Sequence, residues 1–488
     1  MFKRRILTCA IVASIANAAS AAESGPEIRS TLQDQQEVAV TIYNDNLALV
    51  KDQRKVELDS GLNSLALRDV SAQIRPETAL LRSLTVPGSL EILEQNFDFD
   101  LLTPEKMLEK YVGKTVSIIR TNTATGVETT EQAQVLSANN GVVLKIGDRI
   151  ETGIPGRIVY DDVPNNLRDR PTLVVQLQNK GVSSQNVELS YLTGGLGWKA
   201  DYVAELNAAE NKLDLSGWVT LTNTSGTAYR NAKLQLVAGD VNQVRDERNA
   251  RMDVMRMKPM ASAAPAPMAE ESLFEYHLYT LNRPTTLAEN QTKQVALLSA
   301  ANVPARKELV LRGAGYYYQD RHGELGQKLK ADVYLEFDNK QNNGLGMPLP
   351  KGILRVYKKD SAGNAQFVGE DNIDHTPKNE IVRLKLGAAF DVTADKKQTD
   401  FTKLPNPAKG VNLYESAYEI VLKNAKKEAV TVKVQEPIPG DWKILQSSHA
   451  QRKADSNTAE WQITIPAEGK TRLNYRGQVK SCAQARYT

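Results

Sequence analysis

The sequence predicts a mostly β protein built as multidomain antiparallel β-sandwiches, and three observations lead to this prediction. Apolar and polar residues alternate with a period of two in many short runs, which places alternate side chains on opposite faces of a sheet. Turn residues such as Asn, Asp and Gly separate these runs at short spacing, as in β-sandwiches. The chain has 488 residues, which is enough for roughly three domains of ordinary size.

The clearest alternation lies in the centre of the chain. Strand patterns run from Trp198 to Leu206 and from Leu215 to Thr222, and a short polar segment joins them. Such a connection favours a hairpin. A third strand pattern runs from Lys233 to Val237. The sequence therefore predicts a central β meander within residues 161–244, which needs a second sheet to cover its apolar face.

A glycine-rich run, Gly194-Gly195-Leu196-Gly197, precedes the first of these strands. Phosphate-binding loops combine such glycines with a GK[ST] sequence and a following helix. Neither feature is present in this sequence, so we interpret the glycines as a β-bulge or a close approach of two backbones.

The first 21 residues have the features of a secretory signal peptide. Lys3-Arg4-Arg5 is a charged start, Ile6 to Ile15 is a short apolar run, and Ala19-Ser20-Ala21 is a cleavage site of small residues. The apolar run is shorter than the roughly 20 residues that a membrane-spanning helix needs. We therefore expect cleavage near Ala21 and a periplasmic or secreted mature chain without a transmembrane segment.

Charge and cysteine content exclude some classes of function. The formal net charge is +3, and the expected signal peptide carries three basic residues, so the mature chain is close to neutral. A neutral chain lacks the electrostatic features of a nucleic-acid-binding protein. Only Cys482 remains after cleavage, which excludes an internal disulfide and leaves an intermolecular one open.

The domains are expected to follow one another along the chain. One helix is predicted over residues 102–112, with Thr103 as its N-cap and Pro104 in its first turn. Asn-Gly and similar pairs between the short strands that follow favour tight hairpins, as in a small barrel. In order, we expect a signal peptide (1–21), a disordered leader (22–36), an N-terminal β domain (37–109), a small SH3-like β-barrel inserted in the first half (110–160), the central meander (161–244), a linker rich in Met, Ala and Pro (245–272), a β-sandwich (273–410), an immunoglobulin-like β-sandwich (411–480) and a tail (481–488).

The densest polar cluster spans residues 369–380. Glu370, Asp371, Asp374 and His375 offer oxygen and imidazole donors, which makes them weak candidates for a metal site or an acid–base pair. Asp371 and Asp374 would point to opposite faces of a strand, so ion pairing and turn capping are the simpler interpretation. The sequence contains no GxSxG, HExxH, Walker A or EF-hand motif, and no catalytic residue or cofactor is assigned.

A second candidate site lies in the predicted linker, which holds five of the eight methionines. Soft thioether sulfurs bind Cu(I), so Met252, Met255, Met257 and Met260 are weak candidate copper ligands. No cysteine accompanies them, and a mobile surface loop is the alternative interpretation.

A set of motifs resembles one protein family. The motifs are Tyr191–Tyr202 (YLTGGLGWKADY), Leu215–Trp218 (LSGW), Leu236–Asp240 (LVAGD), Gly369–Asp371 with His375–Pro377, Lys397–Phe401 (KQTDF) and Ile438–Trp442 (IPGDW). Together they are similar to exported bacterial proteins that carry domain of unknown function 4139, over residues 180 to 480. The resemblance implies a β-rich exported protein and transfers no catalytic residue. Distant relatives labelled mucoidy inhibitor A carry a coiled-coil insertion that this sequence lacks.

Three functions stay open on the sequence alone. Extensive β structure, near-neutral charge and the lack of a known catalytic motif favour a non-enzymatic binding or scaffold protein of the cell envelope, with an envelope protein or glycan as its partner. One alternative is a hydrolase of envelope glycan or peptide that uses the carboxylates of residues 370–380. The other is copper binding by the methionines of the linker.

Overall fold

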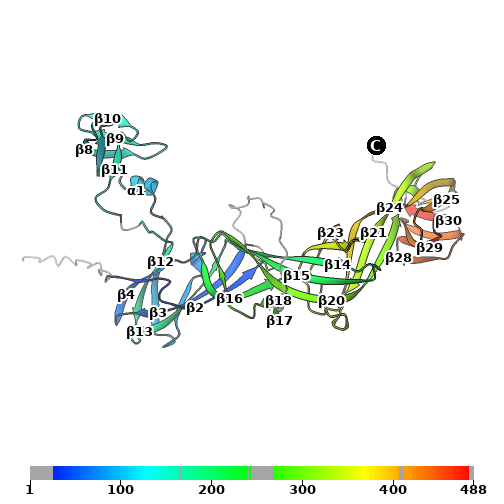
Figure 1. The fold of residues 1–488 in the computed structure, drawn as a ribbon, viewed down its shortest axis with the longest axis horizontal. Helices are drawn as coiled ribbons and strands as arrows, with labels where there is room; N and C mark the ends of the chain where they lie inside the picture. Colours follow the sequence, from blue (N-terminus) through cyan, green and yellow to red (C-terminus); the bar gives the residue numbers. More distant parts are fainter. Residues whose placement is uncertain are drawn as a thin grey trace, which may run out of the picture. The chain divides into compact units, whose positions relative to one another are not determined.

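The computed structural model describes residues 26–44, 46–164, 167–239, 241–242, 268–405 and 411–482, and it is mostly β, as predicted (Figure 1). The expected signal peptide lies outside these residues. Contacts divide the chain into two compact units. Unit 1 comprises Met1–Ala39, Leu49–Gly194 and Ser225–Thr227, and unit 2 comprises Val40–Ala48, Gly195–Thr224 and Ala228–Thr488. Within the described ranges, no helix is long and apolar enough to cross a membrane.

Unit 1 is built from three groups of strands. One sheet has the order β1-β4-β12-β6, a second has the order β10-β9-β8-β7-β11, and β13 lies between β3 and β5. Strands β2 and β3 contribute residues to both units. The elements are β1 (Glu27–Ser30), β2 (Gln35–Tyr43), β3 (Leu47–Glu57), β4 (Gly61–Arg68), the 3-10 helix η1 (Pro76–Thr78), β5 (Leu80–Ser83), β6 (Leu90–Asp98), α1 (Pro104–Lys110), β7 (Thr115–Thr121), β8 (Glu128–Ser137), β9 (Val143–Ile146), β10 (Arg149–Thr152), β11 (Arg157–Val159), β12 (Thr172–Asn179) and β13 (Ser184–Thr193).

Helix α1 and the five-stranded sheet share one core. Thr103 caps the helix by accepting a hydrogen bond from the backbone N–H of Lys106, and Pro104 is its first residue, as the sequence predicts. Met107 and Leu108 of the helix pack with buried residues of the sheet such as Ile118. The predicted small barrel is an open sheet in the structure. Its edge strands β10 and β11 have only four and three residues and pair with β9 and β7, not with each other.

The predicted disordered leader contains an ordered strand. Residues Glu27–Ser30 form β1, which pairs in parallel with Ser64–Leu67 of β4. This segment has little apolar content of its own. Its order comes from a partner strand that is distant in the sequence, and a local composition argument cannot detect such a partner.

Unit 2 is organised around one long sheet with the order β23-β22-β14-β15-β20-β21-β24-β25-β30-β27, to which β26, β28 and β29 are attached. A smaller group has the order β17-β18-β16-β2. The elements are β14 (Leu196–Leu206), β15 (Lys212–Asn223), β16 (Tyr229–Ala238), β17 (Ala269–Leu273), β18 (Tyr276–Thr280), β19 (Thr285–Leu287), β20 (Gln291–Arg312), the 3-10 helix η2 (Gly315–Tyr318), β21 (Glu324–Asp338), the 3-10 helix η3 (Gln341–Asn343), β22 (Gly352–Lys359), β23 (Ala365–Ile373), β24 (Ile381–Leu404), β25 (Val411–Asn424), β26 (Val430–Pro437), β27 (Asp441–Ser447), β28 (Gln451–Asp455), β29 (Thr458–Ile465) and β30 (Lys470–Cys482).

The predicted central hairpin forms, but the predicted meander does not. Strands β14 and β15 pair in antiparallel fashion, and the backbone N–H of Asn207 donates to the carbonyl of Lys212 to close the turn. The other edge of β15 is occupied by β20, and β22 lies parallel to β14. Strand β16 therefore joins a different sheet. Alternation identified the strands correctly, but their pairing depends on segments that follow much later in the chain.

The glycine-rich run before β14 forms a bend at Gly194 and Gly195 that joins β13 to β14. Gly195 has a φ of +77°, a conformation that residues with a Cβ rarely adopt. Its backbone N–H donates a 2.8 Å hydrogen bond to Oδ1 of Asn46.

The last strands of the chain enclose a separate apolar core. Strands β24, β25, β29 and β30 lie together in Figure 1, and their buried residues form one cluster with residues of β26 and η2. Aromatic side chains dominate its centre. Tyr418 stacks on Tyr475 at 5.0 Å between ring centroids, and Trp461 lies 4.7 Å from Tyr475.

Candidate functional site

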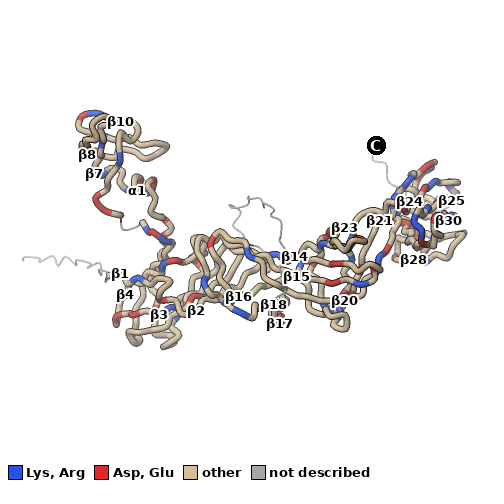
Figure 2. The backbone as a smooth tube through the Cα atoms, viewed as in Figure 1, with Lys and Arg blue, Asp and Glu red and all other residues tan. Residues whose placement is uncertain are grey.

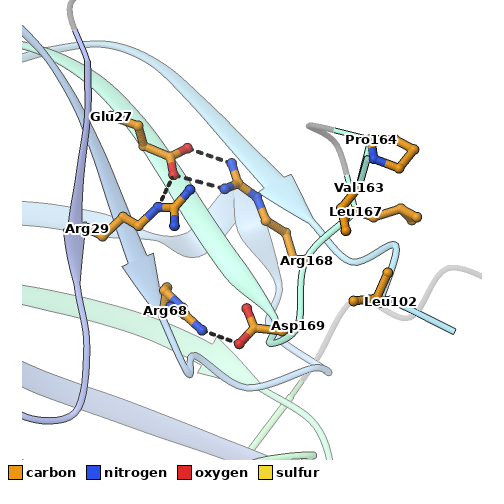
Figure 3. A pocket seen from close by; sticks show the side chains of 9 residues that line it. All are labelled: Glu27, Arg29, Arg68, Leu102, Val163, Pro164, Leu167, Arg168 and Asp169. Carbon is orange, nitrogen blue, oxygen red and sulfur yellow. Dashed lines mark hydrogen bonds and ion pairs between the residues drawn. The ribbon is translucent and has the colours of Figure 1, made fainter. Parts of the chain in front are cut away.

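A cavity of about 510 Å³ opens in unit 1 and has two unlike walls (Figure 3). One wall is ionic and consists of Glu27, Arg29, Arg68, Arg168 and Asp169. The other wall is apolar and consists of Leu102, Val163, Pro164 and Leu167. Elsewhere, acidic and basic residues are interspersed along both units (Figure 2). The ionic wall of the cavity therefore combines three arginines with two carboxylates.

Strand β1 brings the first part of the ionic wall into place. Glu27 pairs with Ser64 and Arg29 with Ala66 of the neighbouring strand β4. Because side chains two residues apart share one face of a strand, Glu27 and Arg29 point the same way. Arg68 is the last residue of β4. A parallel β-bridge between Leu101 and Arg168 positions Arg168, the third arginine of the ionic wall.

Arg168 is the fixed centre of the ionic wall. Its Nη1 and Nη2 lie 2.9 and 2.7 Å from Oε1 and Oε2 of Glu27, and its Nε lies 2.8 Å from Oδ2 of Asp98. A bidentate pair of this kind fixes both side chains in one geometry. The Arg168 guanidinium holds the pKa of Glu27 below its ordinary value, and the hydrogen bond to Glu27 raises the pKa of Arg168. Only 16% of the Arg168 side chain is exposed.

Arg29 is the most exposed arginine of the ionic wall, and Arg68, 24% exposed, pairs with an exposed carboxylate. Nε of Arg29 lies 3.1 Å from Oε1 of Glu27, and 64% of its side chain is exposed. Its two terminal nitrogens make no hydrogen bond to another described residue. Arg68 pairs through Nη2 with the exposed carboxylate of Asp169. Because an exposed carboxylate loses little when it returns to water, a bound anion can replace Asp169 at small cost.

The polar cluster predicted from the sequence is spread over different contacts. Glu370 lies in β23 and pairs with Arg355, with 3.1 Å between Nε and Oε2. Its neighbour Asp371 instead accepts a 2.7 Å hydrogen bond from the backbone N–H of Lys385 in β24. Successive residues of a strand point to opposite faces, which explains the different partners.

The other two members of that cluster lie in the loop after β23. The backbone carbonyl of Asp374 accepts a hydrogen bond from the hydroxyl of Thr376, and Nδ1 of His375 lies 3.3 Å from the backbone nitrogen of Lys351. Within the described part of the chain, no group of three or more His, Cys, Asp or Glu residues is arranged to hold a metal ion. The candidate copper ligands Met252, Met255, Met257 and Met260 lie outside the described residues.

Sequence reasoning did not find the arginine-lined cavity. Its ionic wall comes from three segments, and Arg168 and Glu27 are separated by 141 residues. The local signal was present as Glu27-Ile-Arg29 and Arg168-Asp169, two pairs of opposite charge at short spacing. Such pairs are common on protein surfaces, so they indicate a site only once the fold brings them together.

Comparison with known protein families identifies the chain. The family model of the domain of unknown function (DUF4139) matches residues 187–481, which is more than half of the chain. The cavity residues, from Glu27 to Asp169, precede the matched region. A comparison with curated proteins finds no match. The length of the family match, together with the motifs quoted from the sequence, shows that this chain belongs to the DUF4139 family.

Proposed function

We propose that this chain is a non-enzymatic binding or scaffold protein of the cell envelope, and that the cavity of unit 1 takes up an acidic group of its partner. The ionic wall is the observation that supports this proposal. A guanidinium presents two parallel N–H donors that match a carboxylate or phosphate. Arg29 and Arg68 present such donors around Arg168, which two carboxylates hold in place.

The arrangement favours reversible binding over permanent charge pairing. Arg168 is already satisfied by Glu27 and Asp98, so it supports the wall without taking part in exchange. Arg29 has unused donors, and Arg68 can exchange the exposed Asp169 for another anion. A ligand with one acidic group would therefore bind without leaving a buried charge unpaired.

The apolar wall adds a requirement on the ligand. Leu102 and Val163 are exposed, whereas Leu167 is buried. Binding sites commonly combine an apolar surface with a few polar groups that set orientation. The partner is expected to carry apolar surface next to its acidic group, such as the aliphatic part of an acidic peptide or an acylated acidic glycan.

The proposed location rests on the sequence. The charged start, the apolar run and the small-residue site of residues 1–21 are typical of exported proteins. Envelope polymers of bacteria carry many carboxylate and phosphate groups, which supplies the chemistry that the ionic wall would recognise.

A crosslinking pull-down from intact cell envelopes tests the proposal, with the mature chain as bait. The double variant Arg29→Gln/Arg68→Gln is expected to lose the captured protein or glycan, and capture by the unchanged chain is expected to weaken as ionic strength rises. Arg157→Gln is a matched control, because Arg157 is an exposed arginine of unit 1 that pairs with Glu128 away from the cavity lining. Equal capture by all three proteins would place recognition elsewhere. An empty pull-down together with turnover of an envelope substrate would overturn the binding proposal.

A further inference from the structure

Two oppositely charged side chains meet in the aromatic core at the C-terminal end of unit 2. Lys396 lies in β24 and Glu436 lies in β26, with 2.5 Å between Nζ and Oε2. Only 2% of the lysine side chain and 1% of the glutamate side chain are exposed. The two strands are not paired with each other, since β24 pairs with β21 and β25, whereas β26 pairs with β20 and β29. The contact therefore joins two parts of the fold that share no backbone hydrogen bonds.

The surroundings of this pair are apolar and aromatic. The amine of Lys396 lies 4.2 Å from the ring centroid of Tyr317 and 5.3 Å from that of Tyr418. The hydroxyl of Tyr318 donates a 3.0 Å hydrogen bond to Oε2 of Glu436, and it lies 2.8 Å from the hydroxyl of Tyr475. These rings exclude water from the amine and the carboxyl group.

Separate charges are unfavourable in such a place. Burial disfavours both an ammonium and a carboxylate, and their mutual attraction offsets this penalty only in part. Burial is the largest cause that lowers the pKa of Lys396. Transfer of one proton from the ammonium to the carboxylate leaves a neutral amine in contact with a neutral carboxylic acid. A neutral lysine amine is a nucleophile, and contact with its target replaces a bimolecular encounter.

We propose that Lys396 and Glu436 condense to an intramolecular amide that crosslinks β24 to β26. The lone pair of Nζ attacks Cδ of the protonated carboxyl group and forms a carbon–nitrogen bond. In the tetrahedral intermediate the negative charge lies on Oε1, and the hydroxyl of Tyr318, which donates to Oε2, assists the departure of that oxygen. Oε2 leaves with the proton that it received from Nζ and a second proton from the nitrogen. The products are one amide and one water molecule, and no oxidant or other reactant is consumed.

Gly313 lies close to the carboxyl group of Glu436. A Cβ atom added to Gly313 would lie 2.2 Å from Oε2 and 2.7 Å from Cδ of Glu436. The carboxyl group of Glu436 therefore occupies the space that a side chain at position 313 would need. The amide would also remove both charges from the core, which explains why a lysine and a glutamate occupy positions that otherwise hold apolar residues.

Mass spectrometry of the unchanged, folded chain tests the crosslink. After denaturation, the mass is expected to fall short of the sequence mass by one water molecule, and digestion is expected to yield a branched peptide that joins Lys396 to Glu436. The neighbouring pair Lys397–Glu419 is an internal control, because it has a contact of 2.8 Å with a lysine side chain that is 53% exposed, and it is expected to yield two separate peptides.

Variants assign the lost water to these two residues. Lys396→Met is expected to restore the full mass, and the double variant Lys396→Met/Glu436→Gln provides a chain without a buried unpaired charge in case the single variant does not fold. A full mass in the unchanged chain, with Lys396 and Glu436 in separate unmodified peptides, would show that the contact is an ion pair only and would overturn the proposal.

Discussion

The cavity of unit 1 and the core of unit 2 place similar ion pairs in opposite surroundings. Arg168 and Glu27 line an open cavity, whereas Lys396 and Glu436 are almost completely buried. In the cavity, water can solvate a displaced carboxylate, so pairs can exchange and a ligand can enter. In the core, a displaced charge cannot reach water, so the pair must stay together or lose its charges.

The two regions also differ in the choice of basic residue. Arginine keeps its charge in almost any environment and offers a planar set of donors, which suits recognition of acidic groups. Lysine loses its proton more readily when buried, which makes its amine a nucleophile. The cavity of unit 1 contains Arg29, Arg68 and Arg168, whereas the core of unit 2 contains Lys396. The comparison predicts large effects for changes in the core and small ones for changes in the cavity.

The largest effect is expected from Lys396→Met. This substitution leaves Glu436 buried without its partner, which costs about 3–5 kcal/mol of unfolding free energy. Lys397→Met, on the same strand, removes a half-exposed lysine whose partner Glu419 also pairs with Arg472, and it is expected to cost about 0–1 kcal/mol. Denaturant unfolding of both variants measures the difference. Equal losses would show that burial does not set the strength of these contacts.

A smaller but clear effect is expected from Gly313→Ala. The added methyl group overlaps the carboxyl group of Glu436, which must move at a cost of about 1–3 kcal/mol. The crosslinked fraction measured by mass spectrometry should fall as well. Gly315→Ala is the control, because the nearest atom to its Cβ would be the carbonyl oxygen of Pro437 at 3.6 Å, an ordinary contact. If the two variants behaved alike, the tight approach at Gly313 would be without consequence.

In the cavity, Arg168→Gln is expected to cost about 1–3 kcal/mol in the unfolding of unit 1, because it removes hydrogen bonds to two carboxylates. Arg29→Gln should change stability by about 0.5 kcal/mol or less, since that side chain is mostly exposed. Thermal unfolding of both variants shows which substitution causes the larger loss of stability. A larger loss for Arg29→Gln than for Arg168→Gln would contradict the assignment of Arg168 as the fixed centre.

The smallest effect is a dependence on pH. The pKa of Glu27 is lowered in the folded chain from its ordinary value of 4.5, mainly by its hydrogen bond with Arg168. Between the two values the unfolded chain binds more protons, so unfolding free energy rises with pH in that window. The contribution of Glu27 is therefore complete above pH 4.5 and is lost as the pH falls through the lowered pKa. Measurement of the unfolding free energy at several acidic pH values, in the unchanged chain and in Arg168→Gln, checks this. The unfolding free energy of the variant should depend less steeply on pH, and an identical dependence would count against the Glu27–Arg168 pair.

The sequence by itself determined many of the strands of this protein and its one predicted helix. Alternation with period two identified the strands on both sides of the central turn, and Thr103 with Pro104 placed the start of the helix. It also contained a signal for the buried pair. Lys396 lies in phase with the inward residues Val392 and Ala394, and Glu436 lies in phase with Val432 and Val434. A charged residue in an inward phase indicates a buried partner, but not which one.

Only the tertiary structure decided the partners. In the fold, β20 and not β16 pairs with β15, and β1 pairs with β4. Lys396 contacts Glu436 across 40 residues of the chain, and Arg168 contacts Glu27 across 141 residues. The physical reason is the distance along the chain over which each interaction acts. Caps and alternation depend on neighbours a few residues away, whereas strand pairing and charge pairing depend on which distant segments cover the same apolar face.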